Sequence, residues 1–173
     1  MTGKHFFVKW AIFVIEKFVT EKIVVEPDMS LEDQLLNQKK GCFVTLHKLN
    51  DELRGCIGTI EPFEKNLALE IRNNAISASS RDTRFEPLRE YELDAIYVTV
   101  DVLSPLEKIK SLEELNPKKY GVVISQGYRK GVLLPDLEGI EDVENQIRIA
   151  KMKAGIYNDK EIDIFRFSSK RYF

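Results

Sequence analysis

The spacing of apolar residues divides the chain into segments of two kinds. In the ranges 6–19, 63–80 and 141–154, apolar residues recur at three- and four-residue steps, which predicts amphipathic helices. Six other ranges have the short, alternating or apolar pattern of strands: 42–47, 53–60, 95–103, 121–126, 128–134 and 162–167. Helices and antiparallel strands therefore share one chain.

The predicted elements follow each other in a repeated order. A hairpin, a helix and a single strand occur in this order twice along the chain. We therefore predict an α+β fold of two antiparallel-sheet lobes with packed helices and a cleft between them. The lobes cover about 1–104 and about 105–173 of a single domain. The repeat fits an internal duplication, and it also fits coincidence, because hairpin–helix–strand is a common local order.

The apolar opening of the chain resembles a membrane segment only superficially. Lys9, Glu16 and Lys17 interrupt it, whereas a bilayer requires about 20 mostly apolar residues in succession. No small-residue cleavage pattern follows it either. We therefore expect a helix of the protein core.

Composition narrows the classes of function. A net charge of −2 lacks the basic footprint of a nucleic-acid-binding protein. Two cysteines without a signal peptide fit the reducing cytoplasm. The two histidines, His5 and His47, do not form a metal-binding spacing with the cysteines, so no metal site is predicted. The residues indicate no particular cofactor.

The range 53–60 concentrates the candidate chemistry. Strand alternation places Arg54, Cys56 and Gly58 on one face. A guanidinium beside a thiol lowers the pKa of the thiol below about 8.5. Gly58 would leave space beside the sulfur, and Gly55 would permit a close backbone approach. The alternative is that Cys56 is a small core residue and that Arg54 pairs with a structural carboxylate, which is the commoner case because free cysteine is among the most buried residue types.

The hairpin geometry bears on the partners of Cys56. A turn centred on Asn50 places Cys42 opposite Gly58 and Cys56 opposite Val44. The two sulfurs are then diagonal neighbours, which makes a disulfide a minor option. His47 falls on the face opposite Cys56, so a Cys–His catalytic pair is disfavoured.

The loop 80–87 is a second candidate. Asp82, Arg84 and Phe85 follow the end of a predicted helix. Two arginines and an aspartate there fit an anion-binding role, and they also fit capping of the helix C-terminus. The charges of the second hairpin, Arg129 and Lys130, are expected to be solvated.

Several segments resemble one known family. Residues 53–59, Leu-Arg-Gly-Cys-Ile-Gly-Thr, resemble the signature of the AMMECR domain family. Residues 43–46 and 82–88 resemble its neighbouring segments, and residues 134–135 and 153–155 resemble its later landmarks. The resemblance implies a two-lobed α+β fold with the signature beside a cleft. It also implies a link to Memo-like and radical S-adenosylmethionine proteins, but no established activity.

Three functions compete on these observations. The first is an enzyme or enzyme component, with Cys56 and Arg54 as catalytic candidates, acting on a small anionic substrate or a modified macromolecule. The expected ligand-binding residues are Gly55, Ile57, Gly58, Thr59, Asp82, Arg84 and Phe85. The second is a non-catalytic module that presents the cleft to a protein partner. The third, single-stranded RNA binding, is the weakest because the net charge is near neutral.

Overall fold

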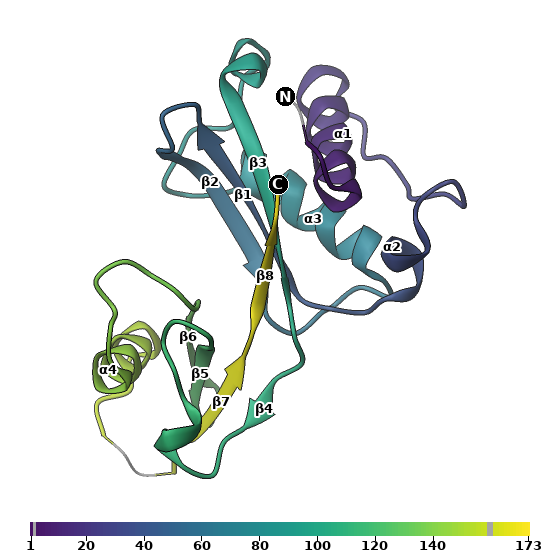
Figure 1. Cartoon of the computed structure of the whole chain (residues 1–173). Coiled ribbons are helices and arrows are strands. Elements are labelled where there is room, and N and C mark those ends of the chain that lie inside the picture. Colours follow the sequence, from purple (N-terminus) through teal and green to yellow (C-terminus); the bar gives the residue numbers. More distant parts are fainter. Residues whose placement is uncertain (2, 159–160) are drawn as a thin grey trace. The chain divides into compact units, whose positions relative to one another are not determined.

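The chain forms two compact units, each with its own sheet and core. The computed structural model describes residues 1, 3–158 and 161–173. The first unit consists of residues 1–103 with 170–173, and the second consists of residues 104–169 (Figure 1). The predicted cleft between the lobes stays a prediction.

The first unit is built on a four-stranded antiparallel sheet. Its strands are β1 (Cys42–Lys48), β2 (Leu53–Thr59), β3 (Ile96–Leu103) and β8 (Ser169–Tyr172), in the order β2-β1-β3-β8. The predicted hairpin and the predicted strand at 95–103 are confirmed. Strand β2 lies at one edge of the sheet, which leaves its outer backbone groups to be satisfied by other means.

The C-terminal strand is a difference from the expected lobes. We expected 105–173 to form lobe two, whereas residues 170–173 belong to the first unit because β8 pairs beside β3. Its sequence, Ser-Lys-Arg-Tyr, contains no apolar run that would have indicated a strand.

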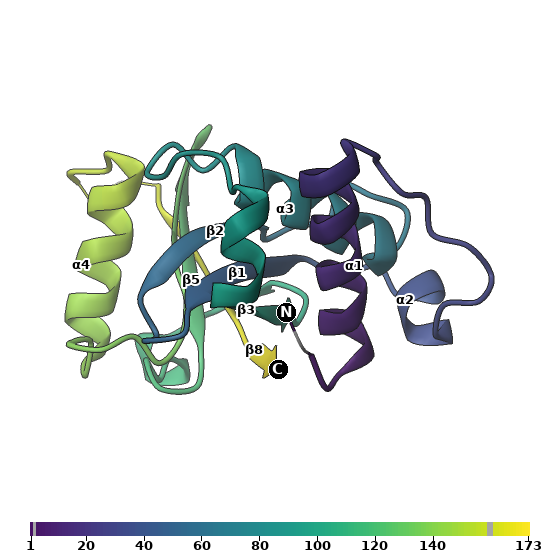
Figure 2. The same ribbon diagram turned by 90° about the horizontal axis from the view of Figure 1, so that it is seen from above.

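Two helices cover one face of the first sheet. Helices α1 (Phe6–Glu21) and α3 (Leu67–Ser80) lie together on that face (Figures 1 and 2), with the short α2 (Asp33–Asn37) beside α3 and the 3₁₀ segment η1 (Glu90–Ala95) before β3. They bury Val44, Leu46 and Val100 of the sheet in one core. Asn66 starts α3 by accepting a hydrogen bond from the backbone N–H of Leu69. None of the described helices is both long and apolar enough to span a bilayer.

The second unit repeats the order of the first. Its elements are β4 (Glu107–Lys108), the 3₁₀ segment η2 (Leu112–Glu114), β5 (Gly121–Gln126), β6 (Arg129–Leu133), α4 (Val143–Ala154) and β7 (Asp163–Phe167). The strand order is β4-β7-β5-β6, so β6-β5-β7 has the same pairing as β2-β1-β3. Asp142 caps the start of α4, and Gly155 ends it in the left-handed conformation with φ of 65°. The predicted repeat is present in the topology.

Candidate functional site

A β-bulge changes the register of the hairpin that carries Cys56. His47 lies opposite Leu53, as a turn centred on Asn50 requires, but Leu46 lies opposite Gly55. Arg54 is therefore an extra residue on β2. Beyond it, Cys56 lies opposite Thr45 rather than Val44. A shift of one residue exchanges the two faces of a strand, so the predicted placement of several side chains is wrong.

Arg54 is turned away from the thiol and holds a loop in place. Its Nε and Nη2 donate to the carboxylate of Glu92 at 2.8 and 3.0 Å, and Nη2 also donates to the carbonyl of Glu86 at 3.2 Å. The side chain is buried, and this contact is the main reason that the pKa of Glu92 lies below its usual range. Arg54 thus joins β2 to the segment before β3. The expectation that it activates Cys56 is wrong.

Asp82 and Arg84 bind the free edge of β2 at Cys56. The backbone N–H of Cys56 donates to Oδ2 of Asp82 at 2.9 Å, and Nη2 of Arg84 donates to the carbonyl of Cys56 at 3.3 Å. The two side chains also pair with each other, Nη2 to Oδ2 at 2.6 Å. The hydrogen bond from Arg84 is the largest cause that holds the pKa of Asp82 far below its usual range. The pair therefore replaces a neighbouring strand at this edge.

Phe85 completes this edge. Its ring centroid lies 5.9 Å from the guanidinium carbon of Arg54 and 5.5 Å from that of Arg84. These distances are within reach of a cation–π contact. Phe85 therefore contacts both arginines, and the side chain of Arg84 remains 56% exposed.

Both glycines of the signature have packing roles. A Cβ at Gly55 would lie 2.4 Å from the carbonyl oxygen of Ala78, so helix α3 approaches the strand closely there. A Cβ at Gly58 would lie 2.2 Å from the ring of Phe43. The space that Gly58 was expected to leave for the sulfur is therefore filled by an aromatic ring.

The last two residues of the expected ligand set also face protein. Ile57 packs against the core of the first unit. The hydroxyl of Thr59 donates to the buried carboxylate of Glu70, which also accepts the backbone N–H of Glu64 at 2.8 Å. Ligand binding by these residues stays a prediction.

Cys56 lies in a row of polar side chains on the face of the sheet away from α1 and α3. The hydroxyl of Thr45 donates to its sulfur at 3.2 Å. Thr45 pairs across the sheet with Thr99, whose hydroxyl lies 3.2 Å from Nε2 of His47. We call these four residues the Cys56 row. His47 shares the face of Cys56, so the prediction that it lies on the opposite face is wrong.

Burial favours the neutral forms of the two titratable side chains of the row, Cys56 and His47. Burial raises the pKa of Cys56, and the hydrogen bond from Thr45 and the charge of Arg84 offset this only in part. Burial and the nearby Arg171 lower the pKa of His47. A thiol and a neutral imidazole therefore coexist at neutral pH, contrary to the predicted low pKa of the cysteine. Arg84, rather than Arg54, is the cation that favours the thiolate.

Cys42 lies on the other face of the sheet from the Cys56 row. It faces the helices, is fully buried, and lies opposite Thr59. Burial raises its pKa to about 12. Both cysteines are free, because they occupy opposite faces of the sheet, so the minor option of a disulfide is wrong. Within the described part of the chain, no group of acidic, histidine and cysteine side chains is arranged to hold a metal ion.

Sequence reasoning missed Thr45, Thr99 and His47 as neighbours of Cys56. The available signal is the alternation of Tyr97, Thr99 and Asp101 with apolar residues, which is typical of a strand with one partly polar face. The register of the hairpin, which aligns that alternation with Cys56, was not visible.

Comparisons with known proteins agree with this architecture. The AMMECR1 family model matches residues 8–172. A Thermotoga maritima protein is 54% identical over 173 residues, covering 99% of both chains. The Clostridium acetobutylicum protein CA_C1420 is 43% identical over 96% of this chain, which spans only 35% of that protein. The structure of uncharacterised PH0010 from Pyrococcus horikoshii covers 96% of this chain and 88% of its own, at 29% identity with a TM-score of 0.88. None of these names states an activity.

Proposed function

This chain belongs to the AMMECR1 family, and we propose that it is an enzyme or enzyme component whose chemistry takes place at the Cys56 row. The observation that carries the proposal is the half-buried Cys56 sulfur, which accepts a hydrogen bond from Thr45 in a row that ends at neutral His47. A cysteine nucleophile requires a group that takes its proton as it attacks. His47 is the imidazole on the same face.

The proposed substrate is a small anion or an anionic group on a modified macromolecule. Arg84 is half-exposed, and its charge favours the thiolate form of Cys56. A guanidinium in this position binds carboxylate or phosphate oxygens through directed N–H groups. Arg54 is a positioning residue, because it holds the loop that carries Arg84 against β2.

The proposed partners follow from the family resemblance. A Memo-like protein and a radical S-adenosylmethionine protein are the two candidates. CA_C1420 supports action together with a further protein domain, because this chain spans only 35% of the length of CA_C1420.

Alkylation of the native protein tests the proposal. We expect iodoacetamide to modify Cys56 at a rate that rises with pH beyond the ordinary thiol pKa of about 8.5, because burial raises the pKa of this thiol. Cys42 serves as an internal control, since it is fully buried with a pKa raised to about 12. The variant Cys56→Ser gives the background rate.

The charge of the reagent tests the anion site. Iodoacetate is the anionic counterpart of iodoacetamide, and an ordinary thiolate in water repels it. We expect Arg84 to raise the ratio of iodoacetate to iodoacetamide rates at Cys56, and Arg84→Gln to lower that ratio about two- to fivefold. Lys130→Gln, a charge change in the second unit, is the matched control. An unchanged ratio in Arg84→Gln, or a Cys56 that reacts only after unfolding, argues against the proposal.

A second candidate is a non-catalytic binding module. It is favoured by the packing roles of Arg54, Gly55 and Gly58, which account for most of the signature without chemistry. Complementation of a deletion strain separates the two functions. Cys56→Ser should abolish complementation by an enzyme and leave complementation by a binding module intact, whereas Arg84→Gln should impair both.

A further inference from the structure

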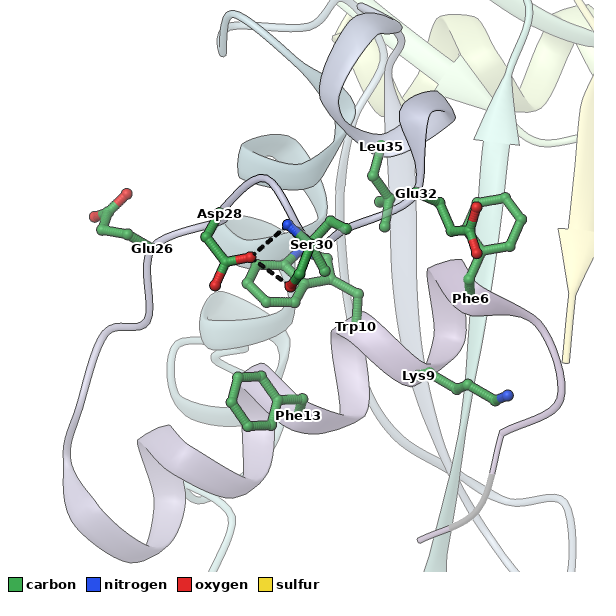
Figure 3. A pocket seen from close by; sticks show the side chains of 10 residues that line it. Phe6, Lys9, Trp10, Phe13, Glu26, Asp28, Ser30, Glu32 and Leu35 are labelled. Atoms are coloured by element: carbon green, nitrogen blue, oxygen red, sulfur yellow. Dashed lines mark hydrogen bonds between the residues drawn. The ribbon is translucent and has the colours of Figure 1, made fainter.

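A hollow lies between helix α1 and the segment 26–35, away from the Cys56 row. It encloses about 350 Å³, near the lower end of the roughly 300–1,000 Å³ typical of small-ligand sites. Its lining is Phe6, Lys9, Trp10, Phe13, Glu26, Asp28, Ser30, Leu31, Glu32 and Leu35 (Figure 3). The hollow thus combines apolar walls with a polar rim.

Two aromatic rings on α1 form one wall of this hollow. The indole N–H of Trp10 donates to the carbonyl of Ala68 at 2.8 Å, which fixes the ring in place at 5% exposure. Phe13 is 44% exposed, and its ring centroid lies 6.0 Å from that of Trp10. An exposed phenyl ring beside a fixed indole is an aromatic surface that a cation can contact.

The rim of the hollow carries negatively charged side chains. Asp28 accepts the backbone N–H of Ser30 at 2.8 Å and also its hydroxyl. These two hydrogen bonds lower the pKa of Asp28, so it stays ionised at neutral pH. Glu32, at the N-cap of α2, is a second exposed carboxylate of the rim.

The other two charged side chains of the lining, Glu26 and Lys9, contribute less charge to the interior of the hollow. Glu26 pairs with Arg72 at 2.6 Å and points outward in Figure 3. Lys9 also points away from the aromatic rings. Asp28 and Glu32 are the remaining carboxylates of the rim, and Glu32 points toward Phe6 in Figure 3.

We propose that this hollow binds a small alkylammonium compound, with its cationic head against Phe13 and Trp10 and its charge balanced by Asp28 and Glu32. Rings within about 6 Å of a cation attract it through their π-faces, and two carboxylates add a Coulomb attraction. A free anion is repelled by the same carboxylates. A neutral apolar molecule of the same shape gains neither the cation–π attraction nor the Coulomb attraction.

Trp10 allows binding to be observed directly, because it is the only tryptophan of the chain. We expect choline chloride, added at constant ionic strength, to change its fluorescence saturably with a dissociation constant on the order of 1 mM. The neutral isostere 3,3-dimethylbutan-1-ol should bind at least about fivefold more weakly, since it has the shape without the charge. The indole N–H resonance of Trp10 provides a second measurement in the same titration.

Variants identify the contacts. Phe13→Leu keeps an apolar side chain and removes the ring, and we expect it to weaken choline binding about two- to fivefold. Phe63→Leu, at a ring that is 85% exposed elsewhere on the first unit, is its control. Asp28→Asn with Glu32→Gln should weaken binding at least about fivefold. Glu113→Gln with Glu138→Gln, an equal charge change in the second unit, should leave it unchanged.

The results separate three outcomes. Saturable choline binding that depends on Phe13 and the two carboxylates supports the alkylammonium site. Equal affinity for choline and the neutral alcohol overturns it and indicates an apolar groove instead. No saturable change in either the fluorescence or the indole resonance also overturns it. All of the substituted residues are exposed, so we expect the variants to fold. An unchanged thermal unfolding temperature verifies this.

Discussion

The two units build the same frame from different side chains. In each, the first strand of a hairpin lies between its partner strand and the strand that follows the helix. In each, a glycine on the second hairpin strand receives a helix carbonyl. A Cβ at Gly55 would lie 2.4 Å from the oxygen of Ala78, and a Cβ at Gly131 would lie 1.9 Å from that of Ala150. The close helix approach is therefore a feature of the frame rather than of the site.

The two units differ in the side chains of the next row along the sheet. One residue beyond the glycine, the first sheet has Cys56, Thr45 and Thr99 side by side, and the second sheet has Val132, Val123 and Phe165. The backbone pairing is equivalent, but one row can donate, accept and react, whereas the other is apolar. Since function lies in sites placed on folds, this difference is the reason that the proposed chemistry is placed in the first unit.

The largest expected effect concerns Arg54, which joins β2 to the segment before β3 in the first unit. Arg54→Met leaves the carboxylate of Glu92 without its guanidinium, and removal of one partner from a buried ion pair costs about 3 kcal/mol or more. Denaturant unfolding monitored by Trp10 fluorescence measures this loss in the first unit.

The double variant Arg54→Met with Glu92→Leu is the control for that loss. It removes both charges, so it should recover part of the free energy of unfolding. If the single variant were as stable as the wild type, the first unit would depend on the shared frame alone.

The shared glycines predict a smaller loss in both units. Gly55→Ala and Gly131→Ala each force a methyl group against a helix carbonyl, which we expect to destabilise by about 1–3 kcal/mol. Hydrogen exchange should show the loss mainly in the unit that carries the substitution. Gly127→Asn is the control, because its turn has open space and φ of 59°, which Asn tolerates. Equal exchange in all three variants would contradict a common frame.

Most of the fold was predictable because local patterns determine it. Helices α1, α3 and α4 follow from apolar spacing. The predicted starts at 63 and 141 lie before the observed caps Asn66 and Asp142, whose side chains accept backbone hydrogen bonds. Strand β8 was not predictable, since its polar sequence becomes a strand only through pairing beside β3.

The residues of the candidate site could be identified from the sequence, but their contacts could not. The cysteine and the Asp82–Arg84 loop were identified from residue type and spacing. The bulge at Arg54 was not, because a bulge depends on how two strands meet and not on the sequence of one. Because of that single extra residue, Arg54 lies away from the Cys56 sulfur, and Thr45 and His47 lie on the same face of the sheet as Cys56.

A transplanted thiol sharpens the comparison of the two rows. Val132→Cys in a Cys56→Ser background places a half-buried thiol at the equivalent position of the second sheet. We expect its ratio of iodoacetate to iodoacetamide rates to be about two- to fivefold below that of Cys56, because the Arg84 charge is a feature of the first row. Equal ratios would show that the row does not influence the reactivity of its thiol.

The smallest expected effect is the pH dependence that His47 gives the first unit. Its pKa in the folded protein is lowered, chiefly by burial and then by Arg171. Below pH about 6.5 the unfolded chain therefore binds the proton more readily, and the free energy of unfolding falls as the pH decreases. Trp10-monitored unfolding between pH 8 and 5 should show this slope, and His47→Gln should reduce it. Burial lowers the pKa of His5 as well, so part of the slope should remain. A slope unchanged by His47→Gln would contradict a lowered pKa of His47 in the folded protein.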